Sequence, residues 1–189
     1  LFRSDWSALI RDFDLNSYPD IFVAAGMTKT SLDSKHVMLG QNNQVYWGGE
    51  TSYSTVAEDP HLLSQSSRGA AAIDIDNDGV SELLIANNNG SVRLLKMKEV
   101  AKQNWLGFSL PSQSDWLHAT LQVRSEDGEF HVYQNLHPQS TFSQHDPRIV
   151  IPVKSDPPYH LIVEKRNGSK LEFSLDKANS YYLLSNSGS

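Results

Sequence analysis

Two segments of this chain, 62 residues apart, repeat one pattern, and this repeat constrains the fold more than any other feature of the sequence. Residues 8–25 read ALIRDFDLNSYPDIFVAA, and residues 70–87 read AAAIDIDNDGVSELLIAN. Each copy contains a small or apolar segment, an acidic loop and a second apolar segment. Short apolar runs bounded by turn-forming residues are typical of buried β-strands. The repeat therefore predicts the same strand–loop–strand unit twice.

The rest of the chain also favours strands over helices. Residues 117–123 alternate apolar and polar side chains, which predicts a half-buried strand that turns at residues 126–128 into a hairpin. Residues 160–165 and 170–175 flank an Asn-Gly sequence, which predicts a second hairpin with a type I′ turn. The best helical candidate, residues 94–103, is short. The sequence therefore predicts an all-β protein.

A strand repeat of this length is typical of four-stranded propeller blades. Residues 45–47 and 53–57 would supply the outer strands of the first blade, and the second copy is cut short near residue 100. We therefore predict one full and one partial blade over residues 1–100 and a small β-sandwich-like domain over residues 104–185. Because closed propellers need about 4–8 blades, we expect the remaining blades to come from a longer parent chain or from another subunit.

The two acidic loops, residues 12–20 (loop one) and 74–82 (loop two), have the composition of a calcium site. Each carries oxygen-bearing side chains at its positions 1, 3, 5 and 9, as in the first part of an EF-hand loop. A tightly curled loop turns alternate side chains inward, and Ca²⁺ prefers about 6–8 oxygen ligands. Position 7 would add its backbone carbonyl. The candidate ligands are Asp12, Asp14, Asn16, Tyr18 and Asp20 in loop one, and Asp74, Asp76, Asp78, Val80 and Glu82 in loop two.

We expect loop two to bind calcium more tightly than loop one. It has four carboxylates instead of three, and it has Gly79 at position 6, where a sharp turn needs a permissive residue and loop one has Ser17. The chain has a net charge of −6, so without the seven loop carboxylates the remainder would carry +1. Mg²⁺ fits less well, because it prefers strict octahedral, water-rich shells. The alternative is a pair of solvated, metal-free loops, since Asp and Asn also form turns with their own backbone.

Composition and missing motifs exclude several functions. The chain has no cysteine, which excludes a disulfide framework, a zinc–thiolate site and a thiol nucleophile. Its negative charge argues against nucleic-acid binding, and no apolar run is long enough to span a bilayer. The histidines lack helical metal-site spacing, and neither a nucleophile elbow nor a phosphate-binding glycine loop occurs. We therefore expect no enzymatic activity on this chain.

The second repeat resembles a known family. It is similar to an FG-GAP/VCBS-type calcium-binding repeat, in particular the last repeat before the ASPIC/UnbV domain of cartilage acidic protein-like proteins. The residues that carry this resemblance are 67–71, 74–79, 87–90 and 93–95. Residues 104–106 resemble the start of the ASPIC/UnbV domain, and residues 140–148 resemble its Ser-Gln-x-Asp-Pro-Arg segment. Two glycine-rich stretches of the family are replaced here by residues 112–116 and 151–154.

The resemblance implies a calcium-stabilised propeller, a secreted, periplasmic or cell-surface location, and interaction or adhesion rather than catalysis. A protein or a glycan would be the partner. The leading hypothesis is a non-catalytic calcium-binding interaction module. The alternatives are an accessory domain of an enzyme whose active site lies outside this chain, and a structural subunit of a larger assembly.

Two further groups of residues have both a functional and a structural interpretation. The four tryptophans could form a carbohydrate platform, although such residues more often fill cores. The polar residues 143–148 could contact a ligand, or they could form a hydrogen-bonded corner with Pro147 fixing the bend. We favour the structural interpretation in both cases.

Overall fold

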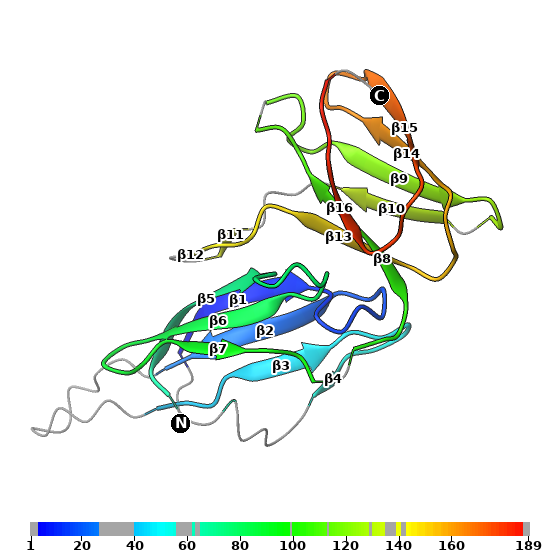
Figure 1. Ribbon diagram of the computed structural model, residues 1–189. Coiled ribbons are helices and arrows are strands. Elements are labelled where there is room, and N and C mark those ends of the chain that lie inside the picture. The colour runs from blue at the N-terminus through cyan, green and yellow to red at the C-terminus, as the bar shows by residue number, and fades with distance from the viewer. Residues whose placement is uncertain are drawn as a thin grey trace, which may run out of the picture. The chain divides into compact units, whose positions relative to one another are not determined.

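The computed structural model describes residues 4–26, 40–55, 62, 65–98, 100–112, 114–128, 130–134, 139–140 and 143–186. These residues form β-strands and no α-helix (Figure 1), as the sequence predicts. Accordingly, no helix in the described part of the chain has the length and hydropathy needed to cross a membrane. The chain divides into two compact units, of which unit 1 comprises residues 1–76, 80–100 and 138–146 and unit 2 comprises residues 77–79, 101–137 and 147–189.

The first repeat copy and the residues after it form a four-stranded antiparallel sheet in unit 1. The strands follow one another in chain order, so each pairs with the next. The predicted outer strands are confirmed at residues 45–47 and 54–55, whereas residues 56–57 lie outside the described residues. The strands are β1 (Asp5–Arg11), β2 (Asp20–Ala25), β3 (Gln44–Trp47) and β4 (Ser54–Thr55).

The second repeat copy forms a three-stranded antiparallel sheet with the same construction. Its strands are β5 (Ser67–Ile73), β6 (Glu82–Asn87) and β7 (Arg93–Leu95). Strands β5 and β6 begin and end 62 residues after β1 and β2. The register even shifts at equivalent places, between Asp5 and Ser7 in β1 and between Ser67 and Gly69 in β5. The predicted repeat of strand, loop and strand is therefore confirmed.

The short helical candidate at residues 94–103 forms no helix in its described residues. Leu94 and Leu95 belong to β7, where they pair with Leu84 and Leu83 of β6, and the other described residues of this segment are not helical. Backbone pairing with a neighbouring strand outweighs a helical pattern too short to form a stable helix by itself.

The described strands of unit 1 do not close into a propeller, so the blade interpretation stays a prediction.

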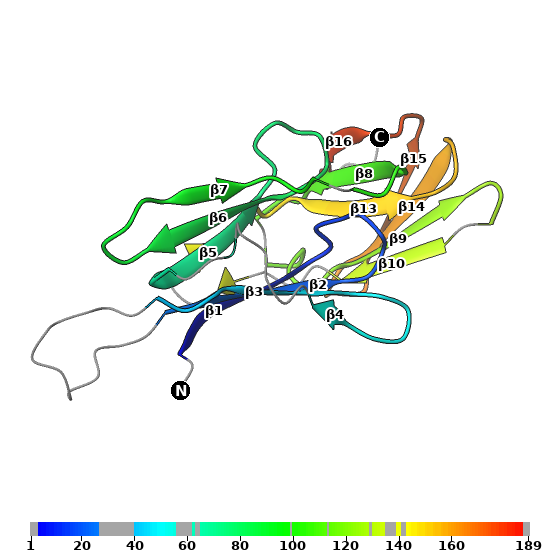
Figure 2. The same cartoon turned by 90° about the horizontal axis from the view of Figure 1, so that it is seen from below.

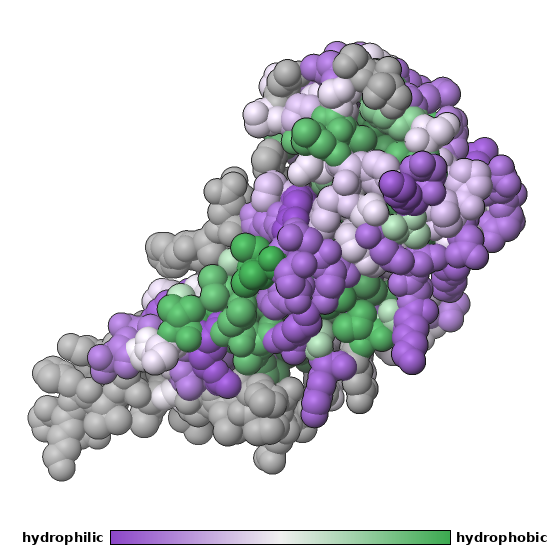
Figure 3. All heavy atoms as spheres, viewed as in Figure 1, coloured by the Kyte–Doolittle hydropathy of each residue, from purple (hydrophilic) through white to green (hydrophobic). Residues whose placement is uncertain are grey.

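One apolar core holds together the two sheets of unit 1, whose ribbons lie one above the other in Figure 2. Its residues come from both sheets, and they include Phe13 from loop one. The cluster consists of Leu9, Phe13, Phe22, Ala24, Val45, Leu62, Ala70, Ala72, Leu83 and Ile85. Apolar side chains also reach the surface over β6, β7 and the turn between them, among them Leu84, Val92 and Leu94 (Figure 3).

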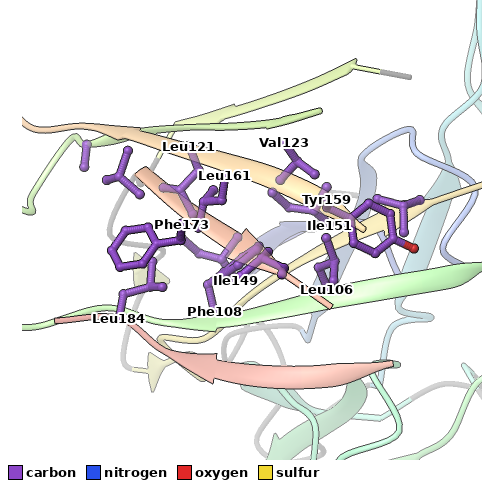
Figure 4. Packing of buried hydrophobic residues seen from close by; sticks show 14 of the residues in the cluster. Leu106, Phe108, Leu121, Val123, Ile149, Ile151, Tyr159, Leu161, Phe173 and Leu184 are labelled. Carbon is purple, nitrogen blue, oxygen red and sulfur yellow. The ribbon is translucent and has the colours of Figure 1, made fainter. Parts of the chain in front are cut away.

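Unit 2 contains two sheets that share a second apolar core. One has the order β10-β9-β14-β15 and the other the order β13-β8-β16, with β16 parallel to β8. Residues from both sheets, such as Leu121, Leu161, Leu106 and Ile149, pack into one cluster (Figure 4). The strands are β8 (Asn104–Ser109), β9 (Thr120–Ser125), β10 (Phe130–Gln134), β13 (Ile149–Val153), β14 (Tyr159–Glu164), β15 (Lys170–Leu175) and β16 (Ser180–Leu183).

Both predicted hairpins of unit 2 are present, but the predicted turn type of the second is wrong. A type I′ turn needs a positive φ at both central residues. Of residues 166–169 only Gly168 has one, at 83°. The Gly168 N–H donates to the Lys165 carbonyl, and the Lys165 N–H donates to the Ser169 carbonyl. This pattern is a wider loop that ends in a left-handed glycine.

The remaining strands, β11 (Gln139–Ser140) and β12 (Ser143–Gln144), pair with each other in unit 1.

Candidate metal centre

Each acidic loop brings three carboxylates together, so each could bind a metal ion. Within each triad, one oxygen per residue lies within 4.8 Å of the others. Oxygens on opposite sides of a Ca²⁺ ion are about 4.6–5.2 Å apart, because each lies about 2.3–2.6 Å from the metal. The spacing and the all-oxygen donor set therefore fit such an ion. The triads are Asp12, Asp14 and Asp20 in loop one, and Asp74, Asp76 and Asp78 in loop two.

The same unusual backbone produces both triads. Positions 4 and 6 have left-handed φ angles in each loop: Leu15 at 58° and Ser17 at 77°, and Asn77 at 60° and Gly79 at 85°. A residue other than glycine costs roughly 1–2 kcal/mol in this conformation, so the surrounding contacts must hold it there. The sequence indicated position 6 through Gly79. It gave no signal at Leu15, which is a residue that rarely adopts a positive φ.

A hydrogen bond between position 2 and position 9 closes each loop. The Phe13 N–H donates to Asp20 Oδ2 at 2.8 Å, and the Ile75 N–H donates to Glu82 Oε2 at 2.9 Å. These residue pairs are equivalent in the repeat. Asp20 also belongs to its carboxylate triad, whereas Glu82 lies outside the second triad. Position 9 therefore holds the two ends of the loop together in both copies.

The connection after β3 braces loop one. The Gly48 N–H donates to Asp20 Oδ1 at 2.7 Å, and the Gly48 carbonyl accepts from Asn16 Nδ2 at 3.1 Å. A Cβ atom at Gly48 would lie 2.3 Å from the Pro19 carbonyl oxygen, which is too close for any side chain. Within the loop, Asp12 accepts hydrogen bonds from the backbone N–H groups of Asn16 and Ser17 at 3.1 Å and 2.8 Å. Loop one is therefore held in its curl by the protein itself.

Burial and mutual repulsion work against ionisation in loop one. Burial, with a further contribution from the charges of Asp14 and Asp20, raises the pKa of Asp12 to about 7. Burial also raises the pKa of Asp20. A bound cation would reverse this effect, because an opposite charge nearby favours the ionised carboxylate.

In loop two, a lysine ammonium lies against the carboxylates. Lys96 Nζ bonds Asp76 Oδ2 and lies 3.6 Å from Glu82 Oε1. Lys96 directly follows β7, one residue beyond the last β6–β7 pair, Leu83 with Leu95, so the strand register places it opposite Glu82. The sequence pattern contains no signal that Lys96 belongs to this site. Only the pairing of β6 with β7 reveals its proximity to the loop.

Six of the ten predicted ligands belong to the two triads and four do not, and the ligand role of all ten stays a prediction. The Asn16 side chain donates its amino group to Asp14, and its oxygen accepts from the Tyr18 N–H. Tyr18 is exposed and Val80 is buried. Glu82 accepts the hydrogen bond that closes loop two.

Comparison of this chain with protein-family models and with curated proteins found no match. The resemblance to FG-GAP/VCBS repeats and to the ASPIC/UnbV domain therefore stays a prediction. The geometry of the two loops is therefore the feature of this chain that points to a function.

Proposed function

We propose that this chain is a non-catalytic interaction module in which each acidic loop binds one Ca²⁺ ion that fixes the strands around it. The observation that carries the proposal is the occurrence of two carboxylate triads at corresponding places in two copies of one strand–loop–strand unit. Solvated acidic loops are common, but they have no reason to share a left-handed backbone at positions 4 and 6 and the same closing hydrogen bond.

The donor set favours Ca²⁺ over other ions. All six triad ligands are carboxylates, and the chain has no cysteine, so soft metals find no thiolate here. Ca²⁺ accepts irregular shells of about 6–8 oxygens, whereas Mg²⁺ demands near-ideal octahedral geometry. The carbonyls of Tyr18 and Val80, the Asn16 and Glu82 side chains and water would complete the shells.

Calcium would act on stability and thereby on the surface that the module presents. A cation that binds only the folded loop stabilises the fold by RT ln(1 + [L]/Kd), which is about 2.7 kcal/mol at 100 times Kd. Each loop joins two strands of one sheet, so the ion would order the sheet edge as well as the loop. We propose a secreted, periplasmic or cell-surface setting with a protein or glycan partner, as the resemblance implies.

Thermal melting with CaCl₂ and with chelator tests the proposal. The wild type is expected to melt at a higher temperature with calcium, and isothermal titration calorimetry is expected to detect two bound ions. The double variant D14N/D76N should lose both effects, because it removes one charge from each triad without changing side-chain shape. D156N, which neutralises an exposed carboxylate in unit 2, is the matched control. A wild-type melting temperature that calcium leaves unchanged would contradict the proposal.

A further inference from the structure

Two residues from a distant part of the chain lie at the start of loop two. His145 and Asp146 belong to unit 1, although 73 residues separate His145 from its partner Ala72. The Ala72 N–H donates to His145 Nδ1 at 3.1 Å, and the Asp146 N–H donates to the Ala72 carbonyl at 3.0 Å. In the described part of its sheet, β5 pairs with β6 on one edge, and His145 and Asp146 satisfy backbone groups on the opposite edge.

The Asp146 side chain extends this contact to the first metal-ligand candidate of loop two. Asp146 Oδ2 accepts a hydrogen bond from the Asp74 N–H at 3.4 Å. Both residues are buried, with Asp74 1% and Asp146 9% exposed. A hydrogen bond to a charged acceptor is stronger in such surroundings than in water. It fixes the Asp74 backbone at the point where β5 ends and the curl begins, and so it orients the Asp74 carboxylate.

Loop one has a different support at the equivalent place. Its position 1 is Asp12, and its bracing residue is Gly48 after β3. Asp146 also faces this loop, since its backbone carbonyl accepts from Arg11 Nη1 at 3.5 Å and Arg11 directly precedes Asp12. That contact uses the backbone, however, and a side-chain substitution leaves its acceptor in place. The Asp146 carboxylate therefore distinguishes the two loops.

We infer that Asp146 is a positioning residue for the loop-two metal site, where its carboxylate holds the Asp74 backbone so that the Asp74 side chain meets those of Asp76 and Asp78. This inference rests on the proposed function. Groups that orient metal ligands are typically worth about 10–100-fold in metal affinity. The coupling is reciprocal, so an ion in loop two also stabilises the attachment of residues 145–146 to β5.

Calcium titration of variants that keep only one loop intact tests the inference. In a D14N background, which leaves loop two as the intact site, D146A is expected to raise the Kd for Ca²⁺ by about 10–100-fold. D146N should restore most of the affinity, because its amide oxygen still accepts from the Asp74 N–H. In a D76N background, which leaves loop one intact, D146A should change the Kd by less than about twofold. D156A removes a unit 2 carboxylate that accepts from Asn104 Nδ2 at 3.2 Å, and it is the matched control.

Amide hydrogen exchange of D14N supplies a readout that does not depend on the folding of D146A. Exchange at Ala72 and Asp146 should slow by about tenfold or more when CaCl₂ is added, since the ion and the contact stabilise each other. Unchanged exchange, an unchanged Kd for D14N/D146A, or an equal loss of affinity at both loops would each overturn the inference. A D14N protein that binds no calcium would instead overturn the loop-two assignment itself, and the inference with it.

Discussion

Loop one and loop two share a backbone and differ in what surrounds it. Loop one is anchored in the core of unit 1, where Phe13 and Leu15 are 1% and 3% exposed. In loop two the residue equivalent to Phe13 is Ile75, which is 54% exposed. Loop one is braced by the backbone of Gly48, whereas loop two is supported by the side chains of Lys96 and Asp146.

The two loops reduce the repulsion between their crowded carboxylates in different ways. In loop one, burial raises the pKa of Asp12 to about 7, so that a proton reduces the repulsion. In loop two, the Lys96 ammonium contributes a positive charge from the end of the neighbouring strand. A bound Ca²⁺ ion would therefore displace a proton from loop one and compete with the Lys96 side chain at loop two. This contrast can be tested separately at each loop.

The largest difference is expected when the position 9 carboxylate is removed. Asp20 is fully buried and accepts from the N–H groups of Phe13 and Gly48, whereas Glu82 accepts from the single N–H of Ile75. An unpaired buried N–H costs about 1–3 kcal/mol, so D20A should destabilise the metal-free protein by roughly 2–5 kcal/mol and E82A by about half as much. Urea unfolding in chelator measures both values. An E82A cost equal to that of D20A would contradict the greater internal support of loop one.

Next in size is the loss of a triad ligand at each loop. D14A should raise the Kd of the weaker calcium-binding step by at least about 100-fold, and D76A should raise the Kd of the tighter step by as much. Even groups that only orient metal ligands are worth about 10–100-fold in affinity, and these two side chains are themselves candidate ligands. Calorimetric titration of the wild type and both variants gives the two constants. Loss of the weaker step in D76A would reverse the assignment of the tighter site to loop two.

The triads could be predicted from the sequence because the information is local. A spacing of two residues between oxygen-bearing side chains is sufficient to indicate a curl, and the second copy repeats this spacing. The same reasoning indicated the left-handed conformation of Gly79, which only glycine adopts without cost. It also found the strands on either side, whose apolar residues form the unit 1 core.

The supports of the loops could not be predicted, because they come from residues that only the folded chain brings close. Lys96 reaches Asp76 through the pairing of β6 with β7, and Asp146 reaches Asp74 across 72 residues of chain. The short helical pattern at residues 94–103 likewise does not reveal that its first residues pair with β6. The type I′ turn was wrong because Asn167 does not adopt the positive φ that its Asn-Gly sequence favours.

A smaller effect is expected from pH in the metal-free protein. The pKa of Asp12 rises from 3.8 to about 7 on folding, so the folded state holds a proton that the unfolded state releases. The resulting stability is fully present below the unfolded pKa and is lost as pH rises through 7. In chelator, the melting temperature should therefore fall by several degrees more between pH 5.5 and pH 8 in the wild type than in D12N.

The comparison with D12N cancels the contributions of other groups. Burial lowers the pKa of His145, and this shift acts in the opposite direction, since its stability is lost as pH falls. Both proteins contain His145, so only Asp12 distinguishes them. Equal pH profiles for the wild type and D12N would contradict the role of a proton in loop one.

The smallest effect concerns the lysine of loop two. Lys96 is half exposed, and an exposed ion pair contributes about 0.2–1 kcal/mol, so K96M should tighten calcium binding to loop two by about 1.4- to fivefold. Methionine keeps the length of the side chain and removes the charge that competes for Asp76. K98M, which removes an exposed positive charge two residues further along, is the matched control and should change the affinity less. Titration in the D14N background measures both constants. An equal gain in the calcium affinity of loop two in K96M and K98M would mean that net charge, and not the contact with Asp76, controls this affinity. The two loops would then differ in burial alone.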